Sequence, residues 1–123
     1  MEIRNKKNHP LRHAFNGLRW ALRTQNNYRI HLLISLAVVV SGVFFSISYY
    51  EWLLIFVLIT VGLVVEAINT ALEAATDAIT REWNEDIKIA KDVSAAAMLT
   101  FAFGALCIAI LIFIPKIIVF IGF

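Results

Sequence analysis

Four polar side chains interrupt an otherwise apolar helical segment between Val65 and Asp77, and they recur at helical spacing. They are Glu66, Asn69, Glu73 and Asp77. At 100° per residue the four lie within an arc of about 80°, so they share one helix face. Ionised carboxylates inside a bilayer are costly, and such a stripe indicates a functional site that faces a bundle interior or water.

The sequence lacks the motifs of several common enzyme classes. It has no Gly-rich P-loop, no closely spaced glycines of a dinucleotide fold, no serine nucleophile elbow and no histidine pair at metal-ligand spacing. An enzyme site must therefore combine the acidic face with the basic loop that follows it, which contains Arg81, Lys88 and Lys91. Carboxylates that hold Mg²⁺, a carboxylate that deprotonates a hydroxyl, and a lysine that neutralises phosphate charge suit phosphoryl transfer.

The composition indicates an integral membrane protein. The chain has 123 residues, of which 60% are hydrophobic and 16% charged, and its mean hydropathy is +0.77. Segments 32–50, 52–75 and 93–123 each reach the roughly 20 residues needed to span a bilayer. A buried core helix is the alternative for any one segment, but three in so short a chain leave too little polar surface to cover them.

These features predict an all-α integral membrane protein with a single domain at 1–123. A surface helix at 8–29 precedes three transmembrane helices at 31–50, 52–79 and 87–121. From Pro10 to Arg29 the apolar residues recur three and four apart, with arginines elsewhere, which predicts an amphipathic helix on the cytoplasmic leaflet. The alternative is an ordinary soluble helix packed on another domain.

The basic residues predict the orientation in the membrane. Seven of the eleven Lys and Arg residues precede the first span, and three lie between the second and third. By the positive-inside rule the N-terminus and second loop are expected to be cytoplasmic and the C-terminus outside. The acidic stripe then lies near the cytoplasmic face. Lys116, near the far end, is expected to snorkel towards water.

Two segments of the chain resemble the signature of the prokaryotic diacylglycerol kinase family, which includes undecaprenol kinase. They are Glu66–Asp77 and Ala90–Ala97, and the resemblance extends over almost the whole chain. It implies a homotrimeric bundle that transfers the γ-phosphate of Mg-ATP to a lipid hydroxyl at the cytoplasmic face. The implied partners are ATP, the lipid alcohol and the membrane, with no nucleic acid, and the implied cofactor is Mg²⁺.

The resemblance also implies residue roles by position. The catalytic set would be Glu66 as the base, with Asn69 and Asp77. The ATP-binding residues would be Lys6, His13, Gln25, Glu73, Glu82, Trp83, Asn84, Lys91 and Asp92. Glu73 and Gln25 would hold the metal, and Arg19, Glu66 and Ala95 would contact the lipid. Gln25 stands where the family commonly has an acidic metal ligand. A metal at this position would therefore be bound by a neutral amide oxygen instead of a charged carboxylate.

Other interpretations remain open at this point. A small ion- or proton-coupled transporter also uses intramembrane carboxylates, although it would have them spread through the membrane. A weakly active family member with a regulatory role would bind ATP without turnover. Asp77 and Glu82 can also be read as solvated residues at a helix end. His31, at the start of the first span, is expected to cap or pack. The acceptor is either undecaprenol or diacylglycerol, and the segment 27–31 resembles the undecaprenol kinase branch.

Overall fold

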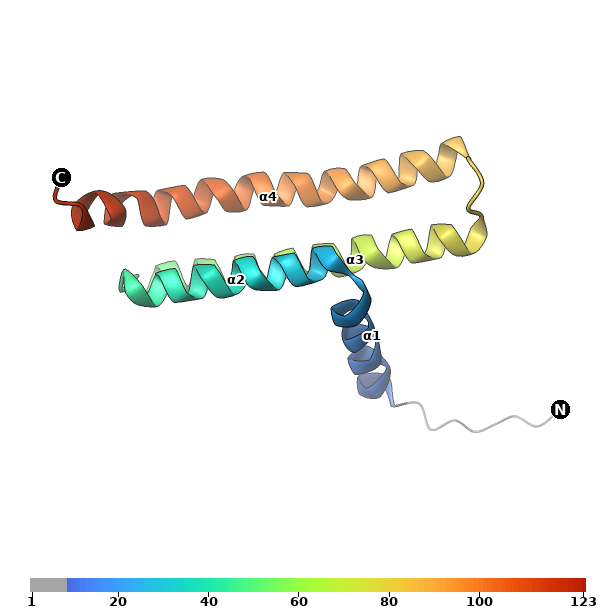
Figure 1. Cartoon of the computed structure of the whole chain (residues 1–123), viewed down its shortest axis with the longest axis horizontal. Helices are drawn as coiled ribbons and strands as arrows, with labels where there is room; N and C mark the ends of the chain where they lie inside the picture. Colours follow the sequence, from blue (N-terminus) through green and yellow to red (C-terminus); the bar gives the residue numbers. More distant parts are fainter. Residues whose placement is uncertain (1–8) are drawn as a thin grey trace.

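The computed structural model describes residues 9–123, and this part of the chain is entirely helical outside its short connections. The helices are α1 (Pro10–Thr24), α2 (Asn26–Phe44), α3 (Tyr49–Ile79) and α4 (Glu85–Phe120). Helix α3 runs antiparallel to both α2 and α4 and contacts both of them. Helix α1 branches off at a steep angle where α2 begins, while α3 continues past that point (Figure 1).

Helices α2, α3 and α4 are each long and apolar enough to cross a membrane, as the sequence predicted. At 1.5 Å per residue, the 31 residues of α3 measure about 46 Å, which exceeds a hydrocarbon core of about 30 Å. One end of α3 must therefore project beyond the core. Many apolar side chains on these helices are exposed, among them Leu36, Phe103 and Leu111, which fits surroundings of lipid or other protein rather than water.

The break between α1 and α2 comes earlier than the expected limit at residue 29. Gln25 is extended, with φ −105° and ψ 108°, and a new helix starts immediately after it. The guanidinium of Arg29 donates hydrogen bonds to the backbone oxygens of Leu22 (2.7 Å) and Arg23. A residue of α2 thereby satisfies carbonyls that the end of α1 leaves unpaired, and this side-chain contact holds the two helices at an angle.

The turn between α2 and α3 occupies residues 45–48, slightly before the expected boundary at 50–52. Ser48 begins α3 through a capping box: the Glu51 amide donates to its hydroxyl (3.3 Å), and its own amide donates to the Glu51 carboxylate (2.7 Å). The same carboxylate accepts a 2.7 Å bond from Lys116 Nζ. Lys116 therefore joins the end of α4 to the start of α3, rather than only snorkelling towards water as expected.

The buried apolar core lies at this same end of the bundle. It consists of Ile47, Ile55 and Ile112, which come from the turn, α3 and α4. At the opposite end the buried residues of α3 are polar instead. The fold therefore separates a packed apolar end from a polar end, and α3 carries side chains to both.

Candidate phosphotransfer site

The acidic stripe of α3 changes from buried to accessible along the helix. Glu66 and Asn69 are only 3% and 7% exposed, Asp77 is half-buried and Glu73 is exposed. A buried charge needs a partner or a ligand, because its desolvation is otherwise uncompensated. The stripe thus has one sheltered carboxylate, that of Glu66. The carboxylates of Glu73 and Asp77, one and two turns beyond Asn69, can be reached by a ligand from solvent.

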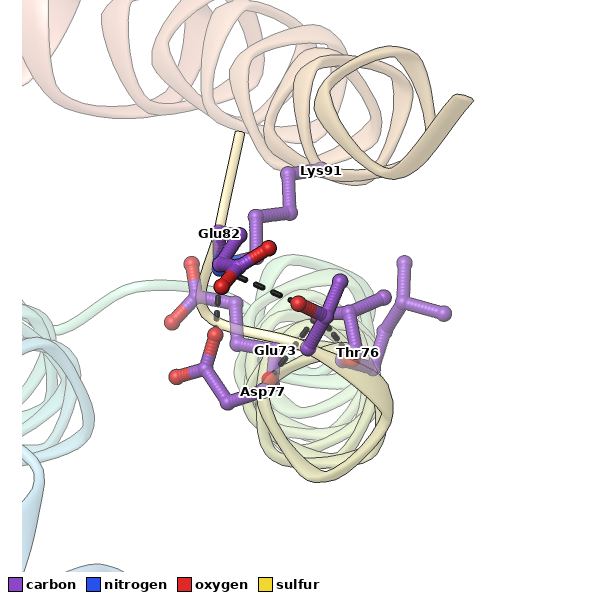
Figure 2. Close-up of polar contacts among 7 residues, drawn as sticks. Glu73, Thr76, Asp77, Glu82 and Lys91 are labelled. Carbon is purple, nitrogen blue, oxygen red and sulfur yellow. Dashed lines mark hydrogen bonds and ion pairs between the residues drawn. The ribbon is translucent and has the colours of Figure 1, made fainter. Parts of the chain in front are cut away.

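Three residues of the stripe each meet a side chain from another helix. Asn69 Oδ1 accepts a 2.7 Å hydrogen bond from Ser94 Oγ of α4. Asp77 Oδ1 lies 2.6 Å from Lys91 Nζ, also of α4, and Figure 2 shows this lysine reaching across to α3. Glu66 Oε2 lies 3.9 Å from His31 Nε2 of α2. The structure therefore brings the stripe and the start of α4 together.

A cavity of about 410 Å³ opens beside the accessible part of the stripe. It lies between α1 and α3, and its lining residues are Trp20, Gln25, Thr70, Glu73, Ala74, Asp77, Ala78 and Arg81. The extended backbone at Gln25, which ends α1, is what places this residue at the cavity opposite α3. Its amide nitrogen donates to Thr24 Oγ1 (3.1 Å), which leaves the amide oxygen available to a ligand.

The oxygen atoms that line this cavity suit a divalent cation that is bound partly by the protein and partly by a polyphosphate. Within residues 9–123 no group of three or more His, Cys, Asp and Glu side chains could hold a metal. The cavity supplies instead the carboxylates of Glu73 and Asp77 and the amide of Gln25. Mg²⁺ is typically bound in this way, through one or two carboxylates together with substrate phosphates and water.

Several residues that the sequence assigned to a site do not line this cavity. His13 and Arg19 are exposed on α1, Ala95 is exposed on α4, and Glu82 and Trp83 are exposed in the α3–α4 loop. Asn84 caps α4 by accepting a 3.1 Å bond from the Ile87 amide, and Asp92 pairs with Lys88 (2.6 Å) on an exposed face. Lys6 lies outside the described residues.

The structure also brings forward residues for which the sequence predicted no individual role in the site. Arg81 and Trp20 line the cavity, Ser94 holds Asn69, and His31 faces Glu66 instead of capping its helix, where Gln25 is the N-cap. The spacing of four between Asp77 and Arg81 was a usable signal for the arginine. The others depend on how the helices pack, which the spacing within one helix does not reveal.

Comparison with known proteins decides what kind of protein carries this site. Residues 12–113 match the family described as prokaryotic diacylglycerol kinase. The chain belongs to this family. It is 38% identical over 104 residues to the undecaprenol kinase of Bacillus subtilis (strain 168), an alignment that covers 85% of each protein. It is 32% identical over 108 residues to the diacylglycerol kinase of Synechocystis sp., covering 85% of this chain and 60% of that relative.

Membership in the prokaryotic diacylglycerol kinase family confirms the resemblance stated above and identifies the chain as a lipid kinase. Together with the three apolar helices, it also makes the chain a multi-pass membrane protein with a nucleotide and a lipid as substrates. The comparisons favour this interpretation over a transporter.

Proposed function

We propose that this chain transfers the γ-phosphate of ATP to the hydroxyl group of a membrane lipid at the cytoplasmic face, with Mg²⁺ as the cofactor. One observation carries the proposal: a single face of α3 presents a sheltered carboxylate, Glu66, and, two turns further along, a cavity of about 410 Å³ that is lined by Glu73 and Asp77. A base in reach of a lipid and a cation site in reach of a nucleotide are what such a transfer needs.

The preferred acceptor is undecaprenol, with diacylglycerol as the second candidate. The relative named undecaprenol kinase is the more similar of the two, at 38% against 32% identity, and its length matches better, with 85% against 60% covered.

We place the site on the cytoplasmic side of a bacterial plasma membrane, with the C-terminus outside. The support is the concentration of basic residues before α2 and between α3 and α4. On α1, the exposed side chains Leu11, Phe15, Leu18 and Leu22 recur at helical spacing, which supports a position flat on the cytoplasmic leaflet. We further propose a homotrimer, in which the exposed apolar surfaces of α2 and α4 meet neighbouring subunits and lipid.

Residues of α3, of α4 and of the break between α1 and α2 have separate roles in the proposed reaction. Glu73 and Gln25 would hold the Mg²⁺ that accompanies ATP, and the cation would supply charge neutralisation at the phosphates. Lys91 offsets further phosphate charge. Glu66 accepts the proton of the lipid hydroxyl. At the same time the hydroxyl oxygen bonds to the γ-phosphorus, and the bond from that phosphorus to the departing ADP breaks. Asn69, whose amide oxygen accepts the hydrogen bond from Ser94, lies about one helical turn from both Glu66 and Glu73.

The remaining assignments stay proposals that rest on the family. Contacts with ATP are assigned to Lys6, His13, Glu82, Trp83, Asn84 and Asp92, an orienting role to Asp77, and contacts with the lipid to Arg19 and Ala95.

The experiment that tests the proposal is transfer of labelled γ-phosphate from Mg-ATP in mixed micelles that contain undecaprenol or diacylglycerol. We expect label in the lipid fraction, with undecaprenol the better acceptor. Faster labelling of diacylglycerol would reverse the order of acceptors. ATP binding without label in either lipid would contradict the proposed function and favour a regulatory family member.

Replacement of Lys91 by Met should raise the KM for ATP by about 10-fold. The substitution removes a cation that lies 2.6 Å from Asp77, and the resulting loss of phosphate attraction corresponds to roughly one charge-assisted hydrogen bond. Arg12→Met is the control, because it removes a cation from the exposed surface of α1, outside the cavity and outside the ATP contacts named above. An equal rise in KM in both variants would show that general charge, rather than the position of Lys91, is responsible.

Replacement of Gln25 by Glu should lower the Mg²⁺ concentration needed for half-maximal rate by about 10-fold. It adds a carboxylate at the cavity that already contains Glu73, and hard cations bind more tightly as the ligand charge rises. The measurement is a titration of initial rate with Mg²⁺ at saturating ATP. An unchanged titration would show that residue 25 does not contact the metal.

A further inference from the structure

The imidazole of His31 is the partner that α2 brings to the proposed base. His31 Nε2 lies 3.9 Å from Glu66 Oε2, and the two side chains are 23% and 3% exposed. The other acidic residues of the described chain with a close basic partner, Glu51, Asp77 and Asp92, have a lysine at 2.6–2.7 Å. Of these four acidic residues, only Glu66 faces an imidazole, and its distance to that partner is longer than a direct hydrogen bond.

One oxygen atom can bridge this separation from beside the line that joins the two atoms. A separation of 3.9 Å is too long for a direct hydrogen bond, whereas one oxygen can lie about 2.8 Å from both atoms. A hydroxyl group can fill that position with every hydrogen bond satisfied, because it has one donor hydrogen and two acceptor lone pairs. It would donate to the carboxylate of Glu66 and accept from the Nε2–H of His31.

The surroundings of His31 indicate which hydroxyl this is. The side chain also lines an apolar cavity of about 490 Å³ between α2, α3 and α4. Its other lining residues are apolar apart from Ser35, whose hydroxyl already donates to the backbone oxygen of His31 (2.7 Å). The cavity suits a hydrocarbon chain, and an alcohol whose chain lies there would present its hydroxyl at the edge where His31 and Glu66 meet.

We propose that His31 orients the acceptor hydroxyl of the lipid alcohol against Glu66, with the hydroxyl oxygen hydrogen-bonded to both Nε2 and the carboxylate. The inference rests on the proposed function, since it concerns the acceptor of that reaction. His31 leaves the proton transfer itself to Glu66. Its hydrogen bond fixes which lone pair of the hydroxyl oxygen faces the incoming phosphorus, and so it affects the chemical step rather than the binding of ATP.

Three substitutions of His31 separate this role from a packing role. The side-chain amide nitrogen of Gln is as many bonds from Cα as Nε2 of His, whereas that of Asn corresponds to Nδ1, and Leu has no donor. We expect His31→Leu and His31→Asn to lower kcat for the lipid by about 10- to 100-fold, the effect of losing one such hydrogen bond. His31→Gln should stay within about threefold of the unsubstituted chain, and the KM for ATP should be unchanged throughout.

The experiment measures kcat and both KM values for the full chain in mixed micelles with undecaprenol, together with thermal unfolding of each variant. His9→Leu and His9→Gln are controls, since His9 is exposed before α1 and its side chain makes no capping bond. Equal loss in all three His31 variants, or full activity in all three, would overturn the inference. An unsubstituted chain that labels no lipid would overturn the proposed function, and this inference with it.

Discussion

Replacement of Glu66 by Gln should lower the rate of phosphate transfer to lipid by at least about 10³-fold, within the range that general bases contribute. The amide has nearly the same shape as the carboxylate but cannot take the proton of the acceptor hydroxyl. Glu66 is 3% exposed and lies 3.9 Å from an imidazole, so its replacement by Gln breaks no short ion pair with a lysine. The measurement is the initial rate of label transfer at saturating ATP and lipid.

Thermal unfolding of the same sample shows whether the loss is chemical, since the Gln variant should unfold within a few degrees of the unsubstituted chain. Glu85→Gln is the control, because Glu85 is exposed in the first turn of α4, away from the stripe. A Glu66→Gln variant that keeps more than about a tenth of the activity would contradict the assignment of the base, since a general base typically contributes about 10²- to 10⁴-fold.

Replacement of Glu73 by Gln should have the second largest effect, a loss of about 10²-fold in kcat/KM for Mg-ATP. Glu73 lines the cavity and forms no hydrogen bond or ion pair through its side chain with any residue from 9 to 123. Its carboxylate is therefore free for a cation, and an amide keeps the oxygen ligand but loses its charge. The measurement is the rate as a function of both ATP and Mg²⁺ concentration.

Two features make the Glu73 experiment specific. Added Mg²⁺ should recover part of the activity of Glu73→Gln, because the substitution weakens a metal site rather than removing a base. Glu73→Asp, which keeps the charge one bond further back, should lie between Gln and the unsubstituted chain. A rate that is insensitive to Mg²⁺ in the Gln variant, with an unchanged KM for ATP, would place the metal elsewhere.

Length and hydropathy predicted the three long helices, and side-chain contacts determined where they end. A transmembrane helix can be recognised from the length and hydropathy of its own segment, without knowledge of the other helices. The end of α1 depends on Arg29, a residue of the next helix that binds the backbone oxygens of Leu22 and Arg23, and no pattern within α1 reveals it. The start of α3 was visible in principle, because Ser48 and Glu51 have the spacing of a capping box.

The stripe on α3 was predictable because its four residues belong to one helix and repeat with its period. Its partners were not, because they lie on helices whose rotation about their own axes is set by packing. His31 shows the difference: its position in the sequence predicted a residue that caps or packs, whereas the packing of α2 on α3 turns its ring towards Glu66. Gln25 was predicted by the resemblance alone, and the extended break before α2 explains why it faces the cavity.

The most direct test of the account is a structure of the protein in a lipid bilayer with Mg²⁺ and a non-hydrolysable ATP analogue. We predict that the phosphates lie in the cavity between α1 and α3, with the metal bound to Glu73 and the terminal phosphate directed along α3 towards Glu66. A nucleotide whose terminal phosphate lies away from this face of α3, with Glu73 free of metal, would contradict the account.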